Sequence, residues 1–391
     1  MIWKRIKQLL SLLRKEGDRF LVVEIYENNN RAGYIRANWQ QKELKVLKTR
    51  EHPDLKKLLK KFGRLNKYKI VVGLDSHLAS TIYSSVVLVR DRYKELIDEP
   101  ELDNLISQAI WKFFDRSRNK VAGKIGVADL DVLLTDVRIR GIKLDSHKVV
   151  NPVGFKAKTV EVQFSQTFLS RGLIDSLKEI LPLNQVVLVS ESGTAWASVV
   201  AKASPTGENF LLANIFSGKT QIFLSEGSQN SYWDRFGWGE DSLKQSLSAD
   251  LAVDKNTAGR LVAKYLKNET SETFRRRFEH LLAKELDALA ELLAAASKKV
   301  DSRLVYVNPF FELPPVFASG FRNRFSRSVT LRHPTLDLIA QNFGFDIKFK
   351  NSADSRSNFG LVALLMEWYL SPQDDKMSQL AKRRVRWLSP I

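Results

Sequence analysis

The chain has 391 residues, of which 44% are hydrophobic and 10% aromatic. This fits two domains, or one large two-lobed domain, and excludes wholesale disorder. The absence of cysteine excludes disulfides, thiolate metal sites, iron–sulfur clusters and cysteine nucleophiles. Lys and Arg total 62 against 44 Asp and Glu, a formal charge of +18, which indicates a polyanionic partner such as nucleic acid or an anionic lipid surface.

No apolar run reaches the roughly 18 residues that a membrane-spanning helix needs. The N-terminal segment does not resemble a signal peptide, because Lys4, Arg5 and Lys7 interrupt its apolar residues and no small-residue cleavage site follows. We therefore expect an intracellular protein, and any membrane contact should lie along the surface of the bilayer.

Residues 1–16 predict a short basic amphipathic helix. Its apolar residues recur at helical spacing, cations fill the other side, and a tryptophan lies at the edge. Such a helix suits the headgroup region of an anionic membrane. The residues expected to bind the membrane are Ile2, Trp3, Lys4, Arg5, Ile6, Lys7, Leu9, Leu10 and Leu13. The alternative is a helix that docks on the protein's own core.

The next elements form a pattern that occurs twice. Strands are expected at 20–26, 34–39 and 44–47, a helix at 53–62 and a strand at 69–74. A similar order returns with strands at 209–216, 221–224 and 230–235, helices at 254–266 and 271–298, and a strand at 302–307. The repetition suggests an internal duplication of one lobe.

Residues 81–164 do not follow this pattern. Strands at 81–90, 128–141 and 156–164 are expected around a helix at 101–116. This segment is typical of a small α+β subdomain inserted into the first lobe.

Two further basic segments stand out. Residues 42–69 hold eleven Lys and Arg against three acids and predict either a face for phosphate or lipid or a solvated surface. Residues 371–391 form a basic C-terminal tail, which is either a second membrane helix or disordered. Its residues expected to bind the membrane are Leu380, Arg383, Arg384, Arg386, Trp387 and Leu388.

Several segments, in collinear order over residues 20–370, resemble the bacterial cell-division protein FtsA. The stretch Asn151, Pro152, Val153 and Gly154 is similar to the one that closes the inserted subdomain of that family. Further similar segments are residues 186–199, 209–224, 236–245 and 360–365. The pilus-assembly protein PilM shares the same overall fold and is the competing resemblance.

The resemblance implies an α/β, actin-like (RNase H-like) fold, with two lobes around a nucleotide cleft and an inserted α+β subdomain. The expected limits are 1–16 for the membrane or partner helix, 17–78 with 165–205 for the first lobe, 79–164 for the insert, 206–370 for the second lobe and 371–391 for the tail. FtsA carries its amphipathic helix at the C-terminus, whereas the clearer helix of this chain is N-terminal.

Such proteins hold ATP phosphates with two hairpins that carry an acid and a glycine, since glycine lets backbone N–H groups approach the phosphate. Here the first hairpin, 24–30, has no glycine and contains the bulky Tyr26. In the second, Asn214 replaces the acid and Phe216 replaces a small residue, and the loop at 307–315 also lacks glycine. We expect a degenerate site that hydrolyses no ATP. The alternative is ATP with magnesium bound without hydrolysis through Ser217, Gly218, Lys219 and Thr220.

No histidine pair has metal-ligand spacing on a helix, so no metal site is expected. By resemblance, the first hypothesis is a scaffold at the cytoplasmic side of the cell membrane that tethers the tubulin-like protein FtsZ and can self-associate into filaments. The second is a PilM-like scaffold that captures a short N-terminal peptide of a pilus membrane protein. The third is a basic nucleic-acid-binding protein.

Overall fold

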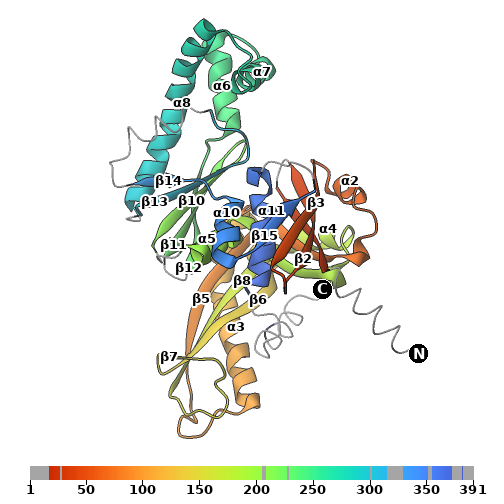
Figure 1. Cartoon of the computed structure of the whole chain (residues 1–391). Coiled ribbons are helices and arrows are strands. Elements are labelled where there is room, and N and C mark those ends of the chain that lie inside the picture. The colour runs from red at the N-terminus through yellow and green to blue at the C-terminus, as the bar shows by residue number, and fades with distance from the viewer. Residues whose placement is uncertain are drawn as a thin grey trace, which may run out of the picture. The chain divides into compact units, whose positions relative to one another are not determined.

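The computed structural model describes residues 17–26, 29–204, 208–226, 229–299, 302–314, 329–350, 355–371 and 381. The chain forms two compact units, one comprising Met1–Ala203 with Thr335–Ile391 and the other Ser204–Pro334. Each unit has its own sheet (Figure 1).

The first unit is built on a six-stranded sheet in the order β15-β3-β2-β1-β4-β9. Strands β3, β2 and β1 form an antiparallel meander, β4 and β9 continue it in parallel with β1, and β15 runs parallel to β3 at the edge. The strands are β1 (Asp18–Ile25), β2 (Asn30–Asn38), β3 (Glu43–His52), β4 (Lys69–Leu74), β9 (Val186–Glu191) and β15 (Asp346–Phe349). The predicted meander, helix and following strand are all present.

Helices cover this sheet because its strands are apolar on both faces. Leu21 and Val23 of β1 share a core with α2 and α4, whereas Phe20 points the other way and contacts Trp368 of α11, with ring centroids 4.8 Å apart. The helices are α2 (Leu55–Lys60), α4 (Arg171–Lys178), α5 (Ser192–Ala203), α10 (Leu336–Phe343) and α11 (Ser355–Tyr369), with short 3-10 turns η1 (Leu65–Lys67), η2 (Asp129–Asp131) and η3 (Leu183–Gln185).

Helix α11 lies unusually close to the sheet, where it packs against α5, β1 and β4. A Cβ atom on Gly73 of β4 would lie 2.3 Å from Leu364 Cδ1. A Cβ atom on Gly360 of α11 would lie 2.4 Å from Glu24 Oε1 and 2.6 Å from the Trp196 ring. The missing side chains of these two glycines therefore set the distance between the helix and the sheet.

The insert is a four-stranded antiparallel sheet in the order β5-β8-β6-β7. Its strands are β5 (Ala79–Val89), β6 (Val132–Leu144), β7 (His147–Val149) and β8 (Thr159–Ser170). Helix α3 (Glu99–Ile125) packs on one face and shares its core. Asp98 caps this helix and Gly126, with φ 71°, ends it. The helix has 27 residues and extends beyond the predicted 101–116 at both ends, by nine residues at its C-terminal end.

The second unit repeats the topology of the first. Its sheet has the order β12-β11-β10-β13-β14, with an antiparallel meander followed by two parallel strands. The elements are β10 (Phe210–Ile215), β11 (Thr220–Glu226), β12 (Gln229–Phe236), α6 (Glu240–Leu251), α7 (Lys255–Leu266), α8 (Glu272–Lys299), β13 (Leu304–Pro309) and β14 (Thr330–Arg332). The order matches β3-β2-β1-β4-β9, as the predicted duplication requires.

One predicted boundary differs. The expected second lobe ran to residue 370, but α10, β15 and α11 belong to the first unit. The reason is that β15 pairs with the edge strand β3 from Asp346↔Glu43 to Phe349↔Val46, and that α11 covers the first sheet. The other predicted limits stay predictions.

The terminal segments lie largely outside the described residues. Residues 1–16, Leu380, Arg383, Arg384, Arg386, Trp387 and Leu388, all expected to contact a membrane, are among those not described. Ala381 is described, and it is fully buried in the core cluster of the insert. Within the described part of the chain, no helix combines the length and hydropathy that crossing a membrane requires.

We predict that Gly360→Ala lowers the free energy of unfolding by about 1–3 kcal/mol, because the added methyl group clashes with Glu24 and Trp196. Gly123→Ala is the matched control, since it also lies inside a helix but its Cβ would meet nothing within 4 Å. It should raise the stability by about 0.5–1 kcal/mol. Urea unfolding measures both, and equal effects of the two changes would contradict the close approach of α11.

Candidate functional site: the carboxyl edges of the two sheets

Three acidic side chains lie at one edge of the first sheet. Glu24 is near the end of β1, Asp75 follows β4, and Glu191 ends β9. These strands are parallel and in register, with Glu24 opposite Gly73 and Gly73 opposite Ser190. The exposed fractions of Glu24, Asp75 and Glu191 are 0%, 2% and 0%. Ligands of open α/β sheets bind at such carboxyl edges, and buried carboxylates need a compensating cation.

The chain supplies the first cation itself. Arg31 lies directly opposite Glu24 in the β1–β2 hairpin, and its Nε donates to Glu24 Oε2 at 2.7 Å. Both residues are buried. Burial raises the pKa of Glu24, and the Arg31 guanidinium opposes that rise. The hairpin that should open toward a phosphate is closed by a cross-strand ion pair.

Lys124 of helix α3 supplies the second cation. Its Nζ donates to Glu191 Oε1 at 2.7 Å and to Ser80 Oγ at 3.3 Å. Glu191 Oε2 accepts hydrogen bonds from the Thr81 backbone N–H and the Thr194 hydroxyl, each at 2.9 Å. Burial lowers the pKa of Lys124, and the carboxylates of Glu191 and Asp75 oppose this. The insert therefore places an ammonium group at the carboxyl edge of the first sheet.

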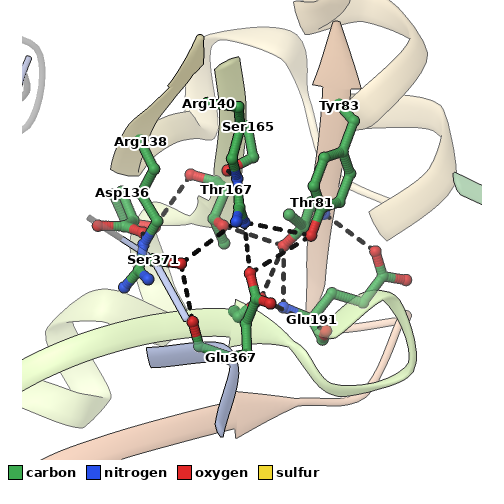
Figure 2. A network of polar contacts seen from close by, with 12 residues as sticks. Thr81, Tyr83, Asp136, Arg138, Arg140, Ser165, Thr167, Glu191, Glu367 and Ser371 are labelled. Carbon is green, nitrogen blue, oxygen red and sulfur yellow. Dashed lines mark hydrogen bonds and ion pairs between the residues drawn. The ribbon is translucent and has the colours of Figure 1, made fainter. Parts of the chain in front are cut away.

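The insert also forms an ion pair with α11 (Figure 2). Arg140 of β6 pairs with Glu367 of α11, and it also donates to Ser371 Oγ at 3.2 Å and to the Tyr83 hydroxyl at 3.3 Å. Burial alone would raise the pKa of Glu367, but the charges of Arg140, Lys202 and Arg138 outweigh it and lower the pKa to about 2. Burial and Glu367 together raise the pKa of Tyr83 to about 12.

The corresponding edge of the second sheet is closed by aromatic rings and amides. Phe216 follows β10 and stacks on Phe310, which follows β13, with ring centroids 4.3 Å apart. Two residues earlier on each strand, Asn308 Nδ2 donates to Asn214 Oδ1 at 3.0 Å. Asn214 is completely buried. No acid of the β10–β11 hairpin is available here to hold a metal-bound water.

Helix α6 begins against the turn of this hairpin and its first N–H groups are already bonded. The backbone N–H of Glu240 donates to Phe216 O at 3.2 Å, and that of Asp241 to Ser217 O at 2.7 Å. The approach requires Gly239, whose Cβ would lie 2.3 Å from Phe216 O. Free N–H groups at a helix start are what make such a terminus a phosphate site, and here the turn occupies two of them.

Comparison with solved structures identifies the architecture. The PilM–PilN type IV pilus biogenesis complex matches at 13% identity over 95% of this chain and 99% of that chain, with a TM-score of 0.54. A Bacteroides thetaiotaomicron protein with an actin-like ATPase fold matches at 10% identity over 90% and 97%, with a TM-score of 0.41. The cytoplasmic domain of EpsL, from the type II secretion system of Vibrio cholerae, matches at 12% identity over 91% and 96%, with a TM-score of 0.34.

The fold is actin-like. No protein-family model matches the sequence, and no curated protein matches it. The predicted fold class is therefore confirmed, whereas the identities between 10% and 13% leave the activity and the partner to be argued from this chain.

The structure places the four predicted nucleotide contacts on one turn of the actin-like fold but gives them different environments. Ser217 and Gly218 are exposed and Lys219 is half-buried. Thr220 is fully buried and donates from Oγ1 to Trp238 O at 2.8 Å. Its hydroxyl is thus committed within the protein. Among the described residues, no group of three or more His, Asp or Glu is arranged to hold a metal ion.

Sequence reasoning gave the hairpin 24–30 but singled out neither the pair of Glu24 and Arg31 nor Asp75, Glu191 and Lys124. The Glu24–Arg31 pair follows from hairpin symmetry, because residues equally distant from the turn face each other. The Lys124–Glu191 pair joins residues 67 positions apart and has no local signal.

We predict that Lys124→Met lowers the stability by about 3 kcal/mol, because it leaves the carboxylate of Glu191 buried without a cation. Adding Glu191→Gln should recover most of that loss, because it removes the charge itself. Lys120→Met, on the exposed side of the same helix, is the control and should change little. Equal losses for the single and double variants in chemical denaturation would show that the ion pair is not the cause.

Glu367 predicts a pH dependence. Its folded-state pKa of about 2 lies below the ordinary 4.5, so its carboxylate stabilises the fold above about pH 5 and the contribution is lost as the pH falls toward 2. Glu367→Gln should cost roughly 3 kcal/mol at neutral pH, and the two unfolding free energies should converge in acid. A constant difference between the two proteins from pH 7 to pH 3 would contradict this assignment.

Proposed function

We propose that the chain is an actin-like scaffold that does not hydrolyse ATP, and that it captures a short N-terminal peptide of a membrane protein in a pilus-type assembly at the cytoplasmic face of the membrane. The proposal that the chain does not hydrolyse ATP rests on one observation: the protein's own side chains fill the carboxyl edges of both sheets. The ion pairs of Arg31 and Lys124 occupy one, and the Phe216–Phe310 stack and the start of α6 occupy the other.

The pilus role is supported by the competing resemblance in the sequence and by the extent of the structural match. The PilM–PilN complex covers nearly all of this chain, and this chain covers nearly all of the matched chain. This chain keeps the whole architecture, but its phosphate hairpins are filled. We therefore expect that it has lost ATP hydrolysis and has kept an outer surface for binding a partner. We infer a binding function for that surface.

The FtsA-like role remains the second candidate. It rests on the order of short segments such as Asn151–Gly154, and no contact in the described residues favours FtsZ as a partner. Both roles share a predicted membrane contact through residues 1–16 and 376–391. Deleting these segments together should weaken flotation with anionic vesicles.

Isothermal titration with Mg-ATP tests the filled site. We expect no binding at micromolar nucleotide, because Arg31 already pairs with Glu24 and the α6 N–H groups are taken. Micromolar binding that Lys219→Ala weakens would contradict the proposal and would restore the nucleotide role of residues 217–220.

Affinity purification of the tagged full chain from cells tests the partner. We expect a membrane protein whose cytoplasmic N-terminal peptide binds alone, as a synthetic peptide, in a titration. Recovery of a tubulin-like protein that binds through its C-terminal peptide would replace the pilus proposal with the FtsA-like one.

A further inference from the structure

A strongly charged surface on the first unit has no role in the proposed peptide capture. Between residues 55 and 67 the chain contains no acid. It exposes six cations there, which we call the basic face: Lys56, Lys57, Lys60, Lys61, Arg64 and Lys67. None of the six forms an ion pair with a described residue, and the nearby acids are engaged, since Asp54 caps α2 and Asp18 pairs with Lys69 at 3.1 Å.

These cations crowd a short helix. The dipole of α2 disfavours Lys56 in its first turn, although it favours Lys57 and Lys60 in its last turn. Lys56 and Lys60, and likewise Lys57 and Lys61, are four residues apart and repel each other. The six-residue helix lies beside β3 (Figure 1), where its buried Leu58 and Leu59 hold it in the core of the unit. A surface that opposes its own local structure indicates an outside requirement for the charge.

We propose that the basic face docks on the surface of an anionic bilayer. A cluster of four to eight Lys and Arg on one face is the composition that anionic lipid headgroups attract. The place of the face in the fold supports a membrane over a nucleic acid. Residues 1–16, which predict an interfacial helix, join the unit at Gly17, and Asp18 contacts Lys69, two residues after the last cation of the face.

The side chains of the face lack the means to stack on bases. Proteins that bind single strands use exposed aromatic rings, whereas Phe62 and Tyr68 are 5% and 4% exposed. Lys67 lies over the Tyr68 ring at 4.9 Å and screens it further. The face offers charge alone, which suits a fluid layer of headgroups. This docking does not depend on the captured peptide.

Vesicle flotation of the full chain tests the proposal. The probes are vesicles of phosphatidylcholine with phosphatidylserine and vesicles of phosphatidylcholine alone. In the basic-face variant all six cations become Gln. Each cation near an anionic surface contributes about fivefold to partitioning, so the variant should lose at least about a hundredfold in affinity for the anionic vesicles. Residues 1–16 stay intact in every protein.

The control variant removes the same charge elsewhere. It carries Gln at six exposed lysines of the insert and its loops: Lys94, Lys112, Lys120, Lys148, Lys156 and Lys158. It should keep wild-type binding within a few fold, because charges beyond about 8 Å from the headgroups are screened. Equal losses for both variants would mean that net charge alone acts, and no loss for either would mean that residues 1–16 suffice. Each result overturns the proposal.

Two further readouts guard the interpretation. The basic-face variant should melt at the same or a higher temperature, since it relieves repulsion in α2. If it melts lower, the double variant Lys60→Gln/Lys61→Gln replaces it and should weaken binding about twenty-fivefold.

A titration of the full chain with duplex DNA tests the nucleic-acid alternative. Tighter binding of the wild type to DNA than to anionic vesicles, lost in the basic-face variant, would replace the bilayer with a nucleic acid.

Discussion

A carboxylate removed from water needs a positive charge or several hydrogen bonds beside it, and the carboxyl edge of the first sheet is organised around that requirement. Glu24 and Glu191 are both completely buried, and both receive a cation from the chain, Arg31 from the next strand and Lys124 from the insert. A nucleotide site at this edge would need that space and those carboxylates for magnesium and phosphate. With the cations in place, the edge stabilises the unit and links the insert to it.

The two sheets close the same edge by different chemistry. They share one strand order, yet the first edge holds ion pairs and the second holds a phenylalanine stack and an amide pair. Neither solution can be converted into the other by one substitution. The divergence is expected when a duplicated fold keeps its topology, which depends on the apolar pattern of the strands, while the residues after the strands are free to serve local packing.

Much of the topology could be predicted from the sequence, because the strands and helices follow from the spacing of apolar residues over short stretches of the chain. The meanders at both ends of the duplication and the strand at 69–74 follow from alternating or continuous apolar residues. Helix α3 was predicted too short because its last turns carry Arg118, Lys120 and Gly123 on the solvent side while Val121 and Ala122 face the core. Strand β15 and the pair Lys124–Glu191 join distant parts of the chain, and no local pattern announces such contacts.

The cations of this protein fall into two groups, those that form ion pairs inside the fold and those that are exposed on its surface. At the carboxyl edge and at the junction of the insert, cations pair with buried carboxylates, as Arg140 and Lys202 do with Glu367. The cations of the basic face form no such pair with any residue that the structure describes. Internal pairing makes a cation part of the fold, whereas an exposed, unpaired and mutually repelling group of cations weakens it. Under our proposal, an actin-like chain with filled phosphate hairpins uses this exposed group of cations to bind an anionic surface.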